Sequence, residues 1–252
     1  MTVLAVSGLS HAYAGIPVLR AVDLSVAAGE VVAVVGPSGA GKTTLFRCLT
    51  RLVRPDSGVL AVHGRDLMVL DGAALREARR DLGLVFQSYN LVRRLTALQN
   101  VLVGRLADVP TWRVVLRRFP AEEQRLAASC LQQVGLLGHA HTRADRLSGG
   151  QQQRVAIARA LASRARVVLA DEPVASLDPA SAAAVLSALR SLATDHGKAV
   201  VCSLHQVELV AGFADRVVGL RDGRVVLDVP VREFDADAVR ALYGPAGVAE
   251  PV

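Results

Sequence analysis

The residues of this chain best suited to chemistry lie in two glycine-rich segments, each followed by a predicted helix. The first, Gly36-Pro-Ser-Gly-Ala-Gly-Lys-Thr43, follows the apolar run 31–35 and precedes a helix expected over 42–52. The second, Leu147-Ser-Gly-Gly-Gln-Gln-Gln-Arg154, leads into a helix expected over 150–163. A helix N-terminus presents unpaired backbone N–H groups and partial positive charge. Each segment therefore predicts a site for an anion such as phosphate.

The first segment has the Gly-x-x-x-x-Gly-Lys-Thr spacing of a P-loop, between a buried strand and a helix. Lys42 is predicted to bridge the β- and γ-phosphates, and the Thr43 hydroxyl to bind Mg²⁺. Lys42 is one of two lysines among 29 basic residues, which favours a compact ammonium over a planar guanidinium here. The predicted nucleotide-binding residues are Gly36, Pro37, Ser38, Gly39, Ala40, Gly41, Lys42, Thr43 and Thr44.

A pair of carboxylates, Asp171-Glu172, ends the apolar stretch 167–170. Neighbouring side chains at a strand end point in different directions, so the two carboxylates can take separate tasks. With a P-loop upstream, Asp171 is predicted to hold Mg²⁺ through water and Glu172 to polarise the attacking water. The simpler alternative is a helix cap before Pro173.

Composition narrows the class of protein. The 252 residues are 52% hydrophobic, which is typical of an ordered globular chain with a large core. No apolar run reaches the roughly 18–20 residues needed to span a bilayer, and the N-terminus does not resemble a signal peptide. The net charge of +6 comes from scattered arginines, so nucleic-acid binding is not expected. Cys48, Cys130 and Cys202 show no paired spacing and are expected to be buried, reduced thiols.

The pattern of apolar residues changes twice along the chain. Strand-like patterns before residue 88 and after residue 165 flank a stretch with helical periodicity. We expect an α/β fold: a P-loop (RecA-like) parallel sheet core, an N-terminal antiparallel β layer and a helical insert. The expected organisation is a single domain over 1–243, with a nucleotide-binding core of 1–87 and 166–243, a helical subdomain of 88–165, and a flexible tail over 244–252.

Strands are expected at 3–6, 18–26, 31–35, 59–62, 84–86, 167–170, 199–203, 216–220 and 224–227. Helices are expected at 42–52, 73–80, 97–104, 112–119, 121–134, 150–163, 180–195 and 206–213.

The order and spacing of these motifs resemble the ATP-binding-cassette ATPases over nearly the whole chain, to about Tyr243. The resemblance rests on the P-loop, Gln87, the LSGGQ run, Asp171-Glu172, Ser176-Leu-Asp178 and His205. It implies ATP as the nucleotide, hydrolysed with Mg²⁺ held by Thr43, Gln87 and Asp171. It also gives catalytic roles to Glu172, Gln87 and His205. Gln87 would sense Mg²⁺ and the γ-phosphate, and His205 would contact the γ-phosphate. Tyr13 matches the aromatic residue that stacks on adenine, with an ordinary aromatic of the β layer as the alternative.

The same resemblance implies a homodimer. The turn that opens the helix after Leu147 carries outward donors, and in this family these donors cap the γ-phosphate held by the partner's P-loop. The residues implied to act across the dimer are Ser148, Gly149, Gly150, Gln151 and Asp178. ATP then holds the two copies together, and hydrolysis lets them separate, which can drive transport.

A narrower resemblance, to the phosphonate-importer ATPases, lies in segments 86–105, 111–119 and 170–179 and in Leu204-His-Gln-Val. It implies two membrane permease subunits, a separate solute-binding protein and a place on the cytoplasmic face of the cell membrane. Two departures are mild: Gln99 replaces an acidic residue and Ser203 replaces a common Asn. Trp112 belongs either to the permease-facing surface or to the interior of the insert. Importers of phosphite or phosphate esters, an exporter-type or cell-division cassette, and a soluble cassette acting on DNA or ribosomes remain as alternatives.

Overall fold

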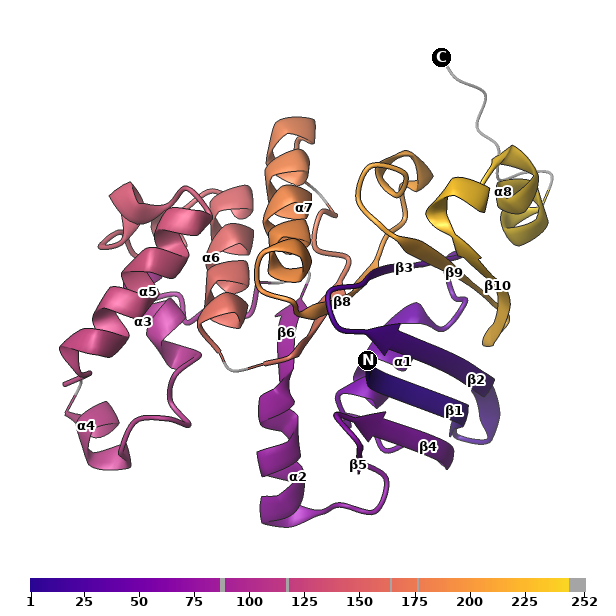
Figure 1. Ribbon diagram of the computed structural model, residues 1–252, viewed down its shortest axis with the longest axis horizontal. Helices are drawn as coiled ribbons and strands as arrows, with labels where there is room; N and C mark the ends of the chain where they lie inside the picture. The colour runs from indigo at the N-terminus through magenta and orange to yellow at the C-terminus, as the bar shows by residue number, and fades with distance from the viewer. Residues whose placement is uncertain (87–88, 117, 164, 176, 245–252) are drawn as a thin grey trace.

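Two sheets and a helical lobe build the chain (Figure 1). The computed structural model describes residues 1–86, 89–116, 118–163, 165–175 and 177–244. The strands are β1 Thr2–Tyr13, β2 Ile16–Ala27, β3 Val31–Val35, β4 Ser57–Val62, β5 Arg65–Asp66, β6 Leu82–Phe86, β7 Val167–Asp171, β8 Ala199–Ser203, β9 Arg216–Arg221 and β10 Arg224–Pro230. The α-helices are α1 Lys42–Leu49, α2 Gly72–Ala78, α3 Ala97–Val103, α4 Thr111–Val115, α5 Ala121–Gln133, α6 Gly149–Ala162, α7 Pro179–Thr194 and α8 Ala236–Tyr243.

The larger sheet has the strand order β10-β9-β3-β8-β7-β6. Strands β6, β7, β8, β3 and β9 run parallel, and β10 pairs antiparallel to β9. All five residues of β3 are fully buried, as its unbroken apolar run predicts for a strand covered on both faces. Val31, Ala33 and Val35 belong to one hydrophobic core, and Val32 and Val34 belong to the other. The sheet thus separates two hydrophobic cores, and the carboxyl ends of its parallel strands lie along one edge.

The smaller sheet is antiparallel, in the order β2-β1-β4-β5. Its inner face packs with α1 and one face of the large sheet into the second core, which contains Leu4, Leu9, Leu45 and Leu60. The predicted N-terminal antiparallel layer is therefore confirmed.

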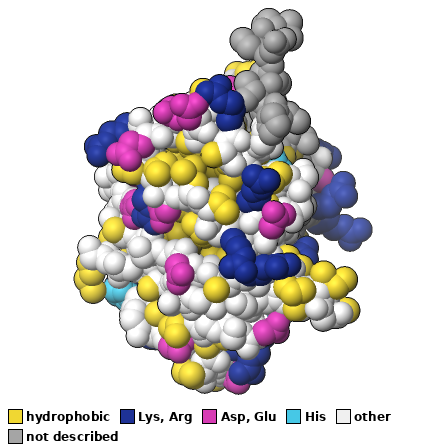
Figure 2. All heavy atoms as spheres, turned by 90° about the vertical axis from the view of Figure 1, so that its right-hand side faces the viewer, with side chains coloured by type: hydrophobic (Ala, Val, Ile, Leu, Met, Phe, Trp, Pro, Cys, Tyr) yellow, Lys and Arg dark blue, Asp and Glu magenta, His cyan; other side chains and the backbone are white. Residues whose placement is uncertain are grey.

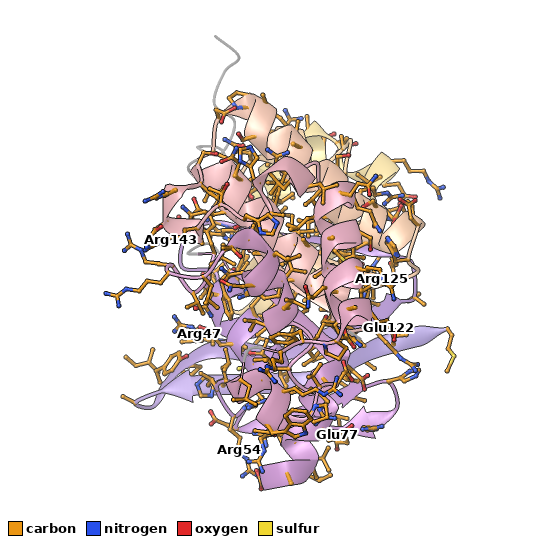
Figure 3. All side chains as sticks on the ribbon, turned by 90° about the vertical axis from the view of Figure 1, so that its left-hand side faces the viewer. Arg47, Arg54, Glu77, Glu122, Arg125 and Arg143 are labelled. Atoms are coloured by element: carbon orange, nitrogen blue, oxygen red, sulfur yellow. The ribbon has the colours of Figure 1, made fainter. Side chains whose placement is uncertain are left out.

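Helices α3, α5 and α6 form the lobe on the left of Figure 1, and α6 also packs on α7. Figure 3 looks onto this lobe, where Glu122 and Arg125 of α5 lie on one side and Arg143 on the other. Ala127, Leu131 and Ile157 are fully buried in its core. Within the described ranges, the helices are all too short or too polar to span a membrane. The expected α/β fold with a helical insert is confirmed.

Two helix predictions were inaccurate, and one helix was not predicted. The helix expected over 206–213 is only a 3₁₀ turn at Val207–Leu209. This segment crosses β3 to pass from β8 to β9, and Gly212 lies within it. The helix expected over 112–119 is shorter, Thr111–Val115, because it lies in a short span between Pro110 and Pro120. Helix α8, N-capped by Asp235, was not predicted.

Candidate functional site

The P-loop lies between β3 and α1 in a conformation that requires glycine at its start. Gly36 has φ +151°, and a Cβ there would lie 2.0 Å from the carbonyl oxygen of Leu220 in β9. Its N–H donates to Tyr243 Oη at 3.1 Å, so α8 holds the loop from 207 positions away in sequence. Burial raises the pKa of Tyr243, which keeps the phenol neutral. The loop is therefore fixed by both its neighbouring strand and the C-terminal helix.

Lys42, the first residue of α1, is buried, and its ammonium lies over the loop. Its Nζ donates to the carbonyl oxygens of Gly36 at 2.6 Å and Pro37 at 3.1 Å. Burial lowers the pKa of Lys42, while the nearby carboxylates of Glu172 and Asp171 oppose that shift. The ammonium is thus a concentrated positive charge beside backbone N–H groups, as a phosphate site requires.

A cavity of ≈350 Å³ brings the P-loop together with two of the predicted catalytic residues. His205, which follows β8, contacts Glu172 Oε1 through Nε2. Glu172, with φ +48°, turns out of the line of β7. The cavity is lined by Val18, Ser38, Gly39, Ala40, Gly41, Lys42, Thr43, Thr44, Glu172 and His205.

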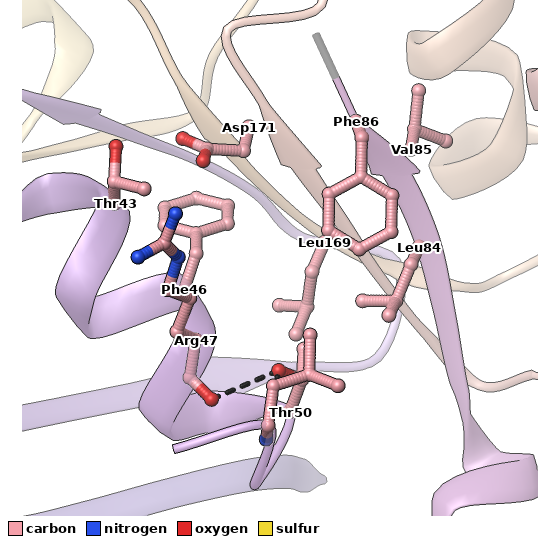
Figure 4. Close-up of a pocket in the computed structure, with 10 residues that line it drawn as sticks. Thr43, Phe46, Arg47, Thr50, Leu84, Val85, Phe86, Leu169 and Asp171 are labelled. Atoms are coloured by element: carbon pink, nitrogen blue, oxygen red, sulfur yellow. Dashed lines mark hydrogen bonds between the residues drawn. The ribbon is translucent and has the colours of Figure 1, made fainter. Parts of the chain in front are cut away.

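A second cavity, of ≈310 Å³, lies between α1 and the strands β6 and β7 (Figure 4). Thr43 and Asp171 lie near one end of it, whereas Leu84, Phe86 and Leu169 form an apolar wall. Burial raises the pKa of Asp171, and a hydrogen bond from Ser203 opposes the shift. A hydroxyl and a partly desolvated carboxylate on one cavity are the oxygen ligands that Mg²⁺ prefers.

The turn at Ser148 forms a capping box on α6. Ser148 Oγ accepts from the Gln151 N–H at 3.3 Å, and Gln151 Oε1 accepts from the Ser148 N–H at 2.9 Å. A Cβ on Gly150 would lie 2.7 Å from Ser181 Oγ, so only glycine allows α6 to approach α7 this closely. Asp178 caps α7 by accepting from the Ser181 N–H at 2.9 Å. The two predicted cross-dimer segments are therefore neighbours within one chain.

Tyr13 and Trp112 are both exposed. Tyr13 is at the end of β1, is 41% exposed and meets the His11 ring edge-on at 4.6 Å. Trp112 is 57% exposed, with the Arg113 guanidinium 5.1 Å from its ring centre. The alternative in which Trp112 packs inside the insert is therefore wrong. Gln87, predicted to sense the γ-phosphate, lies outside the described residues.

Several contacts around the site were not predicted from the sequence. Besides Tyr243, these are Ser203, which bonds Asp171, and Arg159 of α6. Arg159 donates to the carbonyl oxygens of Asn90 at 2.8 Å and Tyr89 at 3.4 Å. Tyr89 and Asn90 both have positive φ, so the start of the insert is tied to α6 in a strained backbone. Ser203 alone carried a signal, as a departure from the Asn that is common at this position in the phosphonate-importer ATPases.

Comparison with known proteins identifies the family to which this chain belongs. Residues 19–175 match the model of the ABC transporter family. The chain is 50% identical to the hypophosphite import ATP-binding protein of Stutzerimonas stutzeri, over 97% of this chain and 72% of that protein. It is 45% identical to the phosphonates import ATP-binding protein of Wolinella succinogenes, over 96% and 88% of the two chains.

Among solved structures, the dimeric bacterial ABC transporter cassette MJ0796 matches with a TM-score of 0.80 and 34% identity, covering 92% of this chain and 100% of that one. The chain therefore belongs to the ABC transporter family, as one of its ATP-hydrolysing cassettes.

Proposed function

We propose that this chain is the energy-coupling ATPase of a bacterial importer for phosphonates or a related phosphorus oxyanion. It would work as a homodimer on the cytoplasmic face of the cell membrane, bound to two permease subunits that receive solute from a separate binding protein. The supporting observation is the cavity in which the P-loop, Glu172 and His205 meet, combined with relatives named as hypophosphite and phosphonates import proteins.

In this proposal, residues 1–87 and 166–243 form the nucleotide-binding core and 88–165 the signature subdomain. The backbone N–H groups of 38–44 and the Lys42 ammonium bind the triphosphate. Tyr13, exposed at the rim of the β layer, stacks on adenine. Glu172 orients a water and takes its proton, and His205, in contact with Glu172, holds the γ-phosphate.

Mg²⁺ fits the residues present. Thr43 and Asp171 line one cavity, and Asp171 is desolvated with an ammonium and a guanidinium nearby that only partly offset its charge. These two residues, with Gln87, would hold the ion, which when bound neutralises charge on the β- and γ-phosphates. Ser203 binds Oδ1 of Asp171, and Oδ2 would be the oxygen that accepts from a ligand water.

The second half of the site would come from another copy. Ser148 is exposed and the N–H groups of α6 begin there, in the helical lobe rather than on the P-loop side of the large sheet. Ser148, Gly149, Gly150 and Gln151 of one chain would cap the γ-phosphate on the other, with Asp178 at the same boundary. In this scheme, neither copy completes the site alone.

The permease would bind the insert near its entry from β6. The exposed apolar side chains of this chain include Val92 in the segment after β6 and Leu52 after α1, and also Trp112 and Leu116 in and after α4. Substitutions at 91–95 or at Trp112 should impair solute uptake more than the basal hydrolysis of ATP. Equal losses of both activities would assign these residues to structure alone.

The charge pattern on one face of the molecule gives no support to nucleic-acid binding. On the face shown in Figure 2, basic and acidic side chains are interspersed. Ion pairs such as Arg216–Asp228 and Arg232–Glu233 also bring acidic side chains next to basic ones. Nucleic-acid binding instead requires a basic stripe or patch.

Glu172→Gln tests the catalytic assignment. It should keep ATP binding while slowing hydrolysis by roughly 10²–10⁴-fold, the usual contribution of a general base. The matched control is Glu208→Gln, an exposed glutamate outside the cavity, which should hydrolyse ATP normally. Turnover of Glu172→Gln close to that of the control would remove Glu172 from the proposed role.

The solute class requires a cellular test. The native host carrying Glu172→Gln should lose growth on methylphosphonate or on hypophosphite as sole phosphorus source, while growth on inorganic phosphate continues. Loss on only one of the two would identify the solute, and normal growth on both would refute the proposed class.

A further inference from the structure

A single buried hydroxyl links the two carboxylate residues at the end of the same strand. Ser203, the last residue of β8, is fully buried. Its Oγ donates to Asp171 Oδ1 at 2.8 Å and accepts from the Glu172 N–H at 2.8 Å. Both hydrogen-bonding capacities of the hydroxyl, donor and acceptor, are therefore used on adjacent residues.

The sheet explains why this serine can reach both residues. Strands β7 and β8 are parallel neighbours, with Ala170 opposite Cys202, so the next residues of the two strands meet at the same edge. On its other side, Ser203 is in register with Val34 of β3, just before the P-loop. Its position is therefore fixed by the central strands of the sheet.

Glu172 needs such a support because its backbone leaves the strand conformation. Its φ of +48° is in the left-handed region, which residues with a side chain rarely adopt without a compensating contact. The bond from its N–H to Ser203 holds this turn, and the turn directs the carboxylate to the cavity where it contacts His205. Asp171, still in the strand, points to the cavity that it shares with Thr43.

We propose that Ser203 is a positioning residue for ATP hydrolysis, whose hydroxyl sets Asp171 and Glu172 in two different orientations at once. The proposal rests on the roles of Asp171 and Glu172 proposed above. It requires a side chain that both donates and accepts at this position. Alanine can do neither, whereas the amide of asparagine can do both.

The chemistry gives a specific expectation for kinetics. Without the hydroxyl, Glu172 loses the contact that aims its carboxylate, whereas the P-loop and Lys42 keep their own contacts. Ser203→Ala should therefore lower kcat by roughly 10- to 100-fold, the scale expected for a small displacement of a reacting group. The KM for ATP should change by less than about 3-fold, because binding and orientation are separable effects.

Rescue distinguishes positioning from packing. Ser203→Asn should recover kcat to within about 3-fold of the wild type, because it restores donor and acceptor. Ser187→Ala, which removes an exposed hydroxyl from α7, is the matched control and should behave as the wild type. If Ser203→Ala does not fold, Ser203→Cys keeps the volume with a much weaker donor and should show the same fall in kcat.

A second measurement does not depend on turnover. Hydrogen exchange at the Glu172 amide, measured by NMR without nucleotide, should accelerate at least 10-fold in Ser203→Ala. It should return toward the wild-type rate in Ser203→Asn, because the acceptor of the Glu172 N–H, Ser203 Oγ, is removed in the first variant and replaced in the second. Exchange in the centre of β3 should stay unchanged in both variants.

The outcomes separate this inference from the proposed function. Normal kcat or normal Glu172 exchange in Ser203→Ala would overturn the inference, as would equal impairment of the alanine and asparagine variants. In each case a slow Glu172→Gln would leave the proposed function standing. Conversely, normal hydrolysis by Glu172→Gln would defeat the proposed catalytic base whatever the Ser203 variants do.

Discussion

Substitution of Ser148 by aspartate separates the two tasks that the structure and the proposed dimer assign to this residue. Within one chain, Ser148 caps α6 through its bond from the Gln151 N–H. Aspartate is as good an N-cap as serine, whereas alanine costs about 1 kcal/mol of stability. Ser148→Asp should therefore leave the free energy of unfolding within about 0.5 kcal/mol of the wild type, while Ser148→Ala should lower it by about 1 kcal/mol.

For ATP-dependent dimerisation, in contrast to stability, Ser148→Asp should be the more damaging of the two variants. In the proposed dimer, Ser148 faces the γ-phosphate of the other copy, so aspartate places like charges together. Two unit charges about 4 Å apart at an effective dielectric constant of 20 repel by about 4 kcal/mol. At 1.4 kcal/mol for each tenfold change, ATP-dependent dimerisation should weaken by about 10³-fold or more. Alanine removes one hydroxyl but leaves the N–H groups of Gly149 and Gly150, so it should weaken dimerisation far less.

The assay combines each variant with Glu172→Gln, so that ATP is bound but not consumed. Light scattering after gel filtration gives the dimer fraction at several protein concentrations, and urea unfolding gives the stability. ATP titration of dilute monomer should give equal affinities for all variants. Dimerisation of Ser148→Asp as strong as that of Ser148→Ala, or a loss of ATP affinity in its monomer, would refute the role of Ser148 across the dimer.

Three further changes test the scaffold. Gly36→Ala puts a Cβ 2.0 Å from the Leu220 carbonyl oxygen, at a residue with positive φ. Urea unfolding should show that the free energy of unfolding falls by at least about 2 kcal/mol, and an unchanged midpoint would contradict this packing. Asn100→Ala removes a buried amide that bonds four backbone groups at the start of the insert. It should lower the free energy of unfolding by about 2–4 kcal/mol. A fall below about 0.5 kcal/mol, the size of a surface change, would show those bonds to be weak. Burial alone would raise the pKa of Asp215, but hydrogen bonds from Arg190 and a β3 N–H lower that pKa below its ordinary value of 3.8. The resulting stabilisation is therefore present above pH 3.8 and is lost as the pH falls through the lower pKa of the folded state. The difference in unfolding free energy between the wild type and Asp215→Asn should shrink on acidification, and a constant difference would refute this effect.

The site residues close together in sequence could be predicted, and those joined only by the fold could not. Gly36 to Thr44 and Ser148 to Gln151 are contiguous, because a turn and a helix N-terminus are local structures that local residues specify. Asp171 and Glu172 are recognisable for the same reason, as carboxylates that end an apolar strand.

The contact between Gly36 and Tyr243 spans 207 positions and depends on where α8 packs against the large sheet. No local pattern predicts that placement. Ser203 was visible only as a departure from a familiar residue, and its bonds to Asp171 and Glu172 depend on β7 and β8 being neighbours.

Local signals also failed where tertiary structure overrides them. The segment 206–213 has the apolar spacing of a helix, and Val210 and Phe213 are indeed buried. Gly212 lies within this segment, however, and glycine disfavours a helix interior by about 1 kcal/mol relative to alanine. Helical periodicity therefore predicted which side chains face the core, but not the length of the element that carries them.

Three of the side chains proposed to act on ATP already have partners within the chain. Lys42 bonds two P-loop carbonyls, Glu172 contacts His205, and Ser148 is engaged with Gln151. A triphosphate can compete well for Lys42, because an anion is a better partner for an ammonium than a carbonyl oxygen. Ser148 differs, because its hydroxyl hydrogen is not used by the capping box and can still donate to a phosphate without breaking the cap. Binding to one copy therefore requires an exchange of contacts, whereas closing a second copy over the phosphate adds donors to a helix end that is already formed.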